Sequence, residues 1–103
     1  MKSYFVYILR CADDSYYTGI TSDLEKRLMQ HNEGKTFDGY TLKRRPVTLV
    51  WYQEFNDPNQ AISWEKRIKR WRRNKKEALI RNEFELLSEL SKNYTEYGKP
   101  NKA

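Results

Sequence analysis

Cysteine is almost absent from this sequence, and so are long apolar runs. Cys11 is the only cysteine among 103 residues, which excludes an internal disulfide and a thiolate metal site. No apolar run approaches the roughly 20 residues that a membrane-spanning helix needs, and the N-terminal residues lack the apolar core of a secretory signal. We therefore expect a soluble, cytoplasmic protein that has no membrane partner.

The chain also lacks internal repeats and low-complexity segments within its body, and its length suits one domain. Aromatic residues make up 15% of it, and the apolar residues fall in periodic segments, which is typical of a globular fold. The formal net charge is +6 and the pI is near 9.5. This charge indicates a polyanionic partner, with nucleic acid favoured over an anionic membrane surface.

Two short aromatic strands are expected near the N-terminus. Residues 4–10 (YFVYILR) are apolar on both faces, which favours a central strand covered on both sides. An Asp-Asp-Ser turn follows, and Tyr16–Ile20 forms the return strand. This turn would bring Tyr7 and Tyr17 close to cross-strand neighbours, with Gly19 leaving open space beside them.

Helix and strand signals alternate through the rest of the chain. The capping box Ser22-Asp23-Leu24-Glu25 opens a helix that runs to about Asn32 and stops at Gly34. The later elements are expected to be a polar surface loop over 35–45, a strand over 47–55, a helix that begins at Asp57-Pro58, a short helix with its N-cap at Asn74, and a last helix over 82–93.

The order β-β-α-β-α-α, with a final α, predicts an α/β (α+β) fold. We expect a small, mainly antiparallel, three-stranded sheet flanked by helices. Residues 1–81 would form the domain, 82–93 a C-terminal helix packed on it or extending it, and 94–103 a flexible tail.

Basic residues are concentrated in one run. Eight of the eleven positions from Lys66 to Lys76 are Lys or Arg. At helical spacing they surround an apolar stripe, so part of the run is interpreted as solvated surface and the rest as a phosphate-contacting surface. Trp64 and Trp71 have the spacing of core residues, although stacking on bases is the alternative. The residues predicted to contact nucleic acid are Arg44, Arg45, Lys66, Lys69, Arg70, Arg72, Arg73, Lys75 and Lys76.

The hairpin carries two short motifs: three residues ending in tyrosine at Phe5-Val6-Tyr7, and Tyr-x-Gly at Tyr17-Thr18-Gly19. They resemble the first and second signatures of the GIY-YIG nuclease family. In the first signature Phe5 replaces the glycine and Val6 the isoleucine, but the tyrosine is kept. This departure looks like the small stand-alone bacterial branch of the family.

The resemblance extends beyond the hairpin, over about residues 3 to 81. The run from Tyr17 to Asn32 (YTGIT-x-DL-x-x-R-x-x-x-HN) matches, and so does a glutamate-bearing helix at Trp64-Glu65-Lys66. The resemblance implies the GIY-YIG endonuclease fold.

The same resemblance implies hydrolysis of DNA phosphodiester bonds with one Mg²⁺ or Mn²⁺ ion, in DNA repair, recombination or processing. In the family the first tyrosine is proposed as general base, and the second positions or assists. An arginine steadies the phosphate, a histidine aids proton transfer, and a glutamate holds the metal. These five roles fall, in that order, on Tyr7, Tyr17, Arg27, His31 and Glu65. Gly19 belongs to the structural motif.

Elementary chemistry is consistent with these implied roles. An arginine fork and a metal ion neutralise the charge on the non-bridging oxygens during phosphoryl transfer. A single carboxylate, with waters completing the shell, suits Mg²⁺. A free phenol, with a pKa of about 10, is a poor base at neutral pH unless cationic neighbours lower that pKa. Arg27 and the metal would be such neighbours of the tyrosines.

Each residue also has a plainer structural interpretation. Tyr7 and Tyr17 suit a core, Arg27 suits a solvated helix face with Asp23 as its partner, and His31 suits a stabilising position near a helix C-terminus. Glu65 would be the i,i+4 ion-pair partner of Lys69. The joint occurrence of these residues in this order favours the nuclease family.

Two other functions remain as alternatives. One is a nucleic-acid-binding module with vestigial or no hydrolytic activity, and the other is a protein-interaction domain. Because little more than a short helix follows residue 81, we expect weak, salt-sensitive and non-specific DNA binding, or delivery of the DNA by a partner protein. Association with the bacterial nucleoid would be compatible with a cytoplasmic location.

Overall fold

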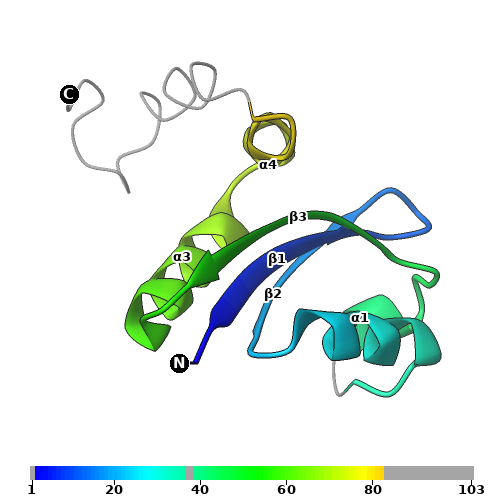
Figure 1. The fold of residues 1–103 in the computed structure, drawn as a ribbon. Helices are drawn as coiled ribbons and strands as arrows, with labels where there is room; N and C mark the ends of the chain where they lie inside the picture. The colour runs from blue at the N-terminus through cyan, green and yellow to red at the C-terminus, as the bar shows by residue number, and fades with distance from the viewer. Residues whose placement is uncertain (1, 37–38, 83–103) are drawn as a thin grey trace. The chain divides into compact units, whose positions relative to one another are not determined.

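An N-terminal hairpin is the centre of the fold in the computed structural model, which describes residues 2–36 and 39–82 (Figure 1). Strand β1 (Tyr4–Arg10) and strand β2 (Tyr16–Thr21) are antiparallel and joined by a polar turn. In this turn the Asp13 carboxylate accepts hydrogen bonds from the backbone N–H and the hydroxyl of Ser15, and Asp14 has a left-handed φ of 69°. The two aspartates therefore close the hairpin, as turn chemistry predicts.

Strand β1 lies in the middle of the sheet. Strand β3 (Thr48–Phe55) pairs with its other edge, which gives the order β2-β1-β3 with every pair antiparallel. The four residues Val6–Leu9 are buried, so both faces of β1 are covered. The prediction of a central strand, and that of a three-stranded antiparallel sheet flanked by helices, are confirmed.

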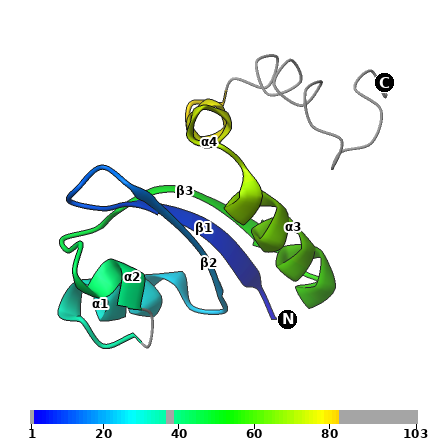
Figure 2. The ribbon, with the colours of Figure 1, turned by 180° about the vertical axis from the view of Figure 1, so that it is seen from behind.

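Helix α1 (Leu24–Glu33) covers one face of the sheet, and the short helix α2 (Gly39–Leu42) lies beside it (Figure 2). Alternation along β1 directs Tyr7 and Leu9 to this face. The core cluster consists of Tyr7, Leu9, Cys11 and Val47, and the partly buried residues packed against it are Tyr17, Leu24, Leu28 and Leu49.

The two ends of α1 are fixed by Asp23 and Gly34. The Asp23 carboxylate accepts a hydrogen bond from the backbone N–H of Lys26 at 3.1 Å. Asp23 is thus the N-cap, which corrects the capping box that was predicted to begin at Ser22. The Asp23 backbone is extended, with φ −140°, so its carboxylate reaches the N–H groups of the first turn. Gly34, with φ 73°, ends the helix as predicted.

Helix α2 occupies part of the segment 35–45, which was predicted to be a surface loop. Thr41 in this helix is fully buried, whereas Tyr40 and Leu42 on either side are exposed. The polarity of the segment did not indicate this helical turn, because one inward-facing side chain gives no periodic signal.

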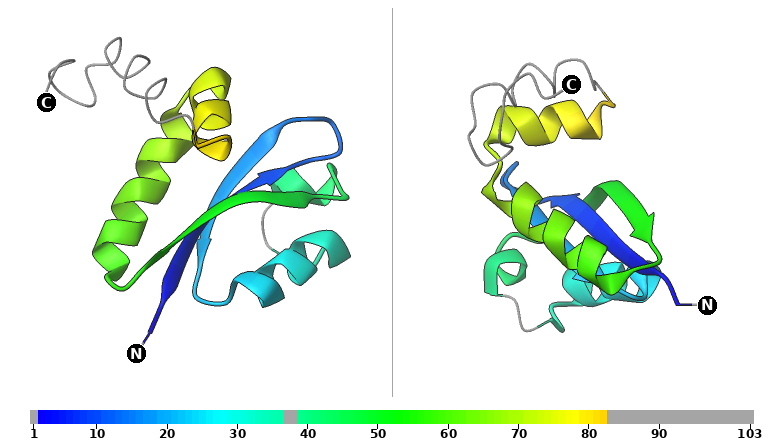
Figure 3. Two further views of the ribbon diagram at one scale, coloured as in Figure 1. Left: turned by 45° about the horizontal axis from the view of Figure 1, so that its top comes forward. Right: turned by 90° about the vertical axis from the view of Figure 1, so that its left-hand side faces the viewer.

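Helix α3 (Pro58–Arg70) packs on the other face of the sheet, as Figure 3 shows. Its buried residues are Ala61, Glu65 and Ile68. Trp64, which was predicted to belong to the core, is 37% exposed, and the Arg67 guanidinium lies 5.1 Å from the centroid of its ring. Burial at positions 61, 65 and 68 leaves Trp64 at the flank of the apolar stripe, and this accounts for the wrong prediction.

The chain divides into two compact units, one that extends to Arg70 and one from Trp71 onward. Helix α4 (Arg73–Ile80) belongs to the second unit and buries Lys75, Ala78 and Leu79. Its N-cap is Arg72 rather than the predicted Asn74, because the extended backbone of Arg72 starts the helix earlier.

The helix predicted over 82–93 and the tail predicted over 94–103 lie, apart from Asn82, outside the described residues. Within the described part of the chain, no helix has both the length and the apolar character required to cross a bilayer.

Candidate active site

The register of the hairpin places Tyr7 directly opposite Gly19. The phenol ring of Tyr7 lies across this glycine: a Cβ atom at position 19 would lie only 2.5 Å from Cζ of Tyr7. The space predicted beside Gly19 is therefore filled by the Tyr7 side chain. The Tyr-x-Gly motif supplies a tyrosine and also the gap in which another tyrosine packs.

Tyr7, His31 and Thr41 form a buried chain of hydrogen-bonding groups. The Tyr7 hydroxyl lies 2.8 Å from Nε2 of His31, and Nδ1 of the same ring lies 3.0 Å from Oγ1 of Thr41. Tyr7 and His31 are each 1% exposed, and Thr41 is 0% exposed. The three side chains come from β1, α1 and α2, so the fold brings together residues that are distant in sequence. His31 thus points into the protein rather than serving as a helix cap.

Tyr17 lies beside this chain and is only partly buried. Its ring centroid is 5.2 Å from that of His31 and 6.4 Å from that of Tyr7. Tyr40 of α2 packs on it with a centroid distance of 6.1 Å. Of the two signature tyrosines, Tyr17 is therefore the more accessible to solvent.

Arg27 lies one helical turn before His31 on α1 and is partly exposed. Its Nη1 donates to the Ile20 carbonyl at 3.5 Å, and its Nε donates to Oε1 of Gln30 at 3.3 Å. The predicted alternative partner, Asp23, instead caps the helix. Among the described residues Nη2 of Arg27 has no hydrogen-bond acceptor, so one end of the guanidinium is available to an anion.

Glu65 is 8% exposed on α3, the helix on the opposite face of the sheet from α1. Its Oε2 lies 2.6 Å from Nζ of Lys69, which is the ion pair foreseen in the plainer interpretation. No other polar partner of Glu65 is present in the described ranges. The fold therefore does not join Glu65 by a direct polar contact to the cluster of Tyr7, Tyr17 and His31.

The metal-binding capacity of Glu65 follows from these contacts. No group of three or more His, Cys, Asp or Glu side chains that could hold a metal occurs among residues 2–36 and 39–82. Oε1 of Glu65 has no protein partner there, while Oε2 is shared with Lys69. A site built on one carboxylate oxygen fits Mg²⁺, which keeps most of its waters, and Lys69 would compete with the ion.

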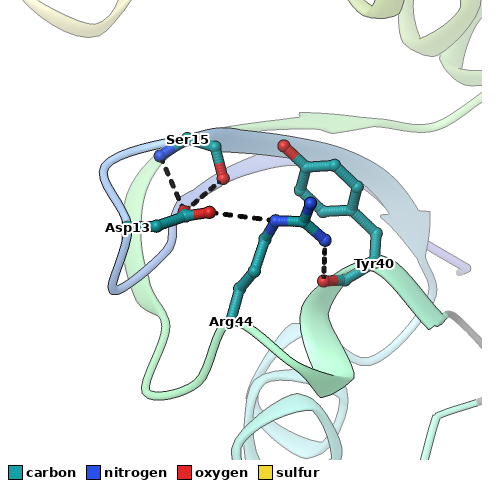
Figure 4. A network of polar contacts seen from close by, with 4 residues as sticks. All are labelled: Asp13, Ser15, Tyr40 and Arg44. Carbon is teal, nitrogen blue, oxygen red and sulfur yellow. Dashed lines mark hydrogen bonds and ion pairs between the residues drawn. The ribbon is translucent and has the colours of Figure 1, made fainter.

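Arg44 and Arg45, both predicted to contact nucleic acid, hold the α2 segment in place. Nε of Arg44 pairs with Oδ2 of Asp13 at 3.0 Å, its Nη1 donates to the Tyr40 carbonyl, and its Cζ lies 3.9 Å from the centroid of the Tyr40 ring (Figure 4). Nε of Arg45 donates to the Leu42 carbonyl at 2.9 Å. Contact with nucleic acid stays a prediction for both arginines.

The predicted basic surface is divided by internal contacts. On α3, Lys66 and Arg70 are exposed, whereas Lys69 pairs with Glu65. In the second unit Arg72 is exposed and Arg73 pairs with Glu77 at 3.0 Å. Lys75 is 1% exposed, with Nζ 4.4 Å from the centroid of the Trp71 ring, and desolvation by burial lowers the pKa of Lys76. Of the predicted contacts in this basic run, the exposed ones are therefore Lys66, Lys69, Arg70, Arg72 and Arg73.

Sequence reasoning missed two residues that support the cluster. Asn32, next to His31, donates from Nδ2 to the Val47 carbonyl at 3.1 Å and accepts from the Val47 N–H at 2.7 Å. The other residue is Thr41. Asn32 lies in the run that matches the family motif, and this position could have indicated that the residue matters. Thr41 lies in a polar segment in which no motif or periodicity indicated a role.

Comparison with known proteins identifies the domain. Residues 3–78 match the GIY-YIG catalytic domain. The UPF0213 protein of Bacillus pumilus is 46% identical over 78 residues, which are 76% of this chain and 79% of the relative. The UPF0213 protein of Staphylococcus saprophyticus is 42% identical over 80 residues, which are 78% of this chain and 96% of the relative.

Two structures solved in solution by NMR are also similar. A UPF0213 protein from Bacillus halodurans has a TM-score of 0.51 and 41% identity, over 76% of this chain and 82% of the other. A protein from E. faecalis has a TM-score of 0.57 and 36% identity, over 84% of this chain and 90% of the other.

Proposed function

This chain belongs to the GIY-YIG family, a family of nucleases, and from that premise we propose that it is a metal-dependent endonuclease that hydrolyses DNA phosphodiester bonds. Members of the family generally use divalent metal ions. DNA repair, recombination or processing is the physiological setting that we propose.

The observation that carries this proposal is the convergence of Tyr7, Tyr17 and His31 on one face of the sheet. Two phenols and an imidazole lie with ring centroids 5.2 to 6.4 Å apart. A core needs apolar contact here, and leucine or phenylalanine would provide it without polar atoms to satisfy. The hydrogen-bonded phenol and imidazole are instead suited to moving a proton.

Arg27 and Tyr17 are partly exposed, so they are the groups that we propose a phosphodiester reaches. The free end of the Arg27 guanidinium would neutralise charge on a non-bridging oxygen, where charge concentrates during phosphoryl transfer. The Tyr17 hydroxyl would orient the attacking water. The buried Tyr7–His31 pair lies next to the Tyr17 ring and would take up the proton that the water loses.

Glu65 is the residue that would hold the divalent ion through its unpaired oxygen. A bound Mg²⁺ or Mn²⁺ ion supplies Lewis acidity and lowers the pKa of coordinated water. The Lys69 ammonium would have to share the carboxylate or move away.

The Lys69–Glu65 ion pair is the observation that favours a second candidate function. A carboxylate already neutralised by a lysine, on the helix that packs on the other face of the sheet from α1, fits a structural role. The second candidate is therefore a nucleic-acid-binding module that does not hydrolyse its ligand.

Turnover separates the two candidates, because both predict binding. We would incubate the protein with single-stranded, duplex and branched DNA in Mg²⁺ or Mn²⁺. We expect cleavage that is lost on chelation and falls about 100-fold or more in Arg27→Ala, Tyr17→Phe and Glu65→Gln. Lys26→Ala is the matched control for Arg27→Ala, because Lys26 is an exposed residue on the same helix, α1. This variant should cleave normally. Absence of metal-dependent cleavage on all substrates would leave the binding module as the better description.

A further inference from the structure

Thr41 has a specific relation to the only histidine of the chain. Its Oγ1 lies 3.0 Å from Nδ1 of His31, while Nε2 of His31 lies 2.8 Å from the Tyr7 hydroxyl. All three side chains are buried, so water does not compete for these positions. Both nitrogens of the imidazole are therefore engaged by protein hydroxyls.

The acidity of the two hydroxyls decides which nitrogen carries the proton. A neutral imidazole has one N–H and one lone pair. A phenol, with a pKa of about 10, is a much stronger hydrogen-bond donor than an aliphatic alcohol. The stronger donor, Tyr7, therefore takes the lone pair at Nε2. The Nδ1–H of His31 then donates to Thr41, whose hydroxyl oxygen accepts.

The backbone around Thr41 is held on both sides. The carbonyl of Tyr40 accepts from Nη1 of Arg44 at 2.9 Å, and the carbonyl of Leu42 accepts from Nε of Arg45 at 2.9 Å. Arg44 is in turn fixed by Asp13 in the β1–β2 turn. A helix of four residues has little rigidity of its own, so these two arginines hold Thr41 where it meets the imidazole.

We propose that Thr41 is a positioning residue that holds His31 as the Nδ1–H tautomer, so that Nε2 stays available to accept the proton of Tyr7. When Tyr7 ionises, its O–H bond breaks and an Nε2–H bond forms, which gives a phenolate beside an imidazolium. The Thr41 oxygen continues to accept from Nδ1–H and stabilises the charged ring. The use of this proton acceptor in catalysis rests on the proposed nuclease function, but the tautomer does not.

The tautomer is measurable without any activity, because one histidine gives one set of ring ¹⁵N signals. At about pH 8, above the ordinary histidine pKa of about 6.5, we expect a protonated Nδ1 and an unprotonated Nε2 in the wild-type protein. Thr41→Val keeps the shape but removes the acceptor, and should shift the ring towards the Nε2–H form. Thr41→Ser restores a hydroxyl and should restore the wild-type signals.

Two outcomes would overturn the proposal: a wild-type Nε2–H tautomer, or a Thr41→Val protein with unchanged ring signals. If Thr41→Val does not fold, the wild-type and Thr41→Ser spectra alone decide. Where cleavage is detected, Thr41→Val should lower kcat by about 10- to 100-fold with little change in KM, a part of what general acid–base catalysis contributes. Absence of cleavage in every protein would count against the nuclease function and leave the tautomer result intact.

Discussion

Gly19 and Tyr7 are cross-strand partners, and the phenol of Tyr7 occupies the space where any other residue at position 19 would place its Cβ atom. The glycine is therefore required by the tyrosine on the next strand. Its backbone does not have a positive φ, so conformational freedom is not the reason.

Replacing Gly19 should displace Tyr7. Gly19→Ala is expected to lower the free energy of unfolding by about 1–3 kcal/mol, because the Tyr7 ring is buried and must move. Much of that loss should disappear when Tyr7→Leu is combined with it, since the clash involves the ring. Chemical denaturation of the four proteins gives the coupling.

Gly39→Ala is the matched control, because a Cβ at position 39 meets nothing within 4 Å. It should leave stability unchanged or raise it slightly. Equal losses at positions 19 and 39, or additive losses for the Gly19 and Tyr7 changes, would show that the close approach is not the cause.

The Lys69–Glu65 ion pair predicts how metal affinity responds to mutation. Lys69→Met removes the cation from Oε2 of Glu65 and should raise the affinity for Mn²⁺ by about fivefold, since unit charges at about 4 Å interact by roughly 1 kcal/mol even in water. Glu65→Gln should abolish the binding. Calorimetric titration with Mn²⁺ measures both effects.

Lys66→Met serves as the control, because Lys66 is an exposed lysine on the same helix. A similar rise in affinity in this variant would indicate a general charge effect. If the wild-type protein and Lys69→Met both fail to bind Mn²⁺, Glu65 is a structural residue.

Asp13 predicts a pH dependence in the loop that supports α2. Hydrogen bonds from Ser15, together with Arg44, hold the pKa of Asp13 below its ordinary value of 3.8. The folded state thus favours the charged carboxylate. Its stabilising effect is present above the ordinary pKa and is lost as pH falls through the lower folded-state value.

The difference in Tm between the wild-type protein and Asp13→Asn should therefore be larger at neutral pH than at a pH below the folded-state pKa of Asp13. Direct titration of the Asp13 carboxyl carbon by NMR provides the pKa itself. A folded-state pKa above 3.8, or a Tm difference that stays constant into acid, would contradict the Asp13–Ser15–Arg44 contacts.

Much of the fold could be predicted because its signals are local. The alternation along β1, the Asp-rich turn and the proline-initiated α3 each lie within a few residues of sequence. Cap positions were less certain because neighbouring residues compete: Ser22 and Asp23 are both good N-caps, and only the backbone geometry selects Asp23.

The candidate site was predictable only in its residues and not in its contacts. Tyr7, Tyr17, Arg27 and His31 were identified by motif, and the fold brings the two tyrosines and the histidine together. The role of Thr41 depends on a hydrogen bond between two helices, for which periodicity carries no information. The exposure of Trp64 likewise depends on which side of α3 meets the sheet.

Arg44 has a further consequence for how salt would affect DNA binding. Its charge is balanced by Asp13, as those of Lys69 and Arg73 are by Glu65 and Glu77. A cation that already has an anionic neighbour neutralises less phosphate charge. It therefore releases fewer counterions from the DNA on binding. The logarithm of affinity should thus fall with the logarithm of salt concentration less steeply than the 20 Lys and Arg residues of the sequence would suggest if all of them were unpaired.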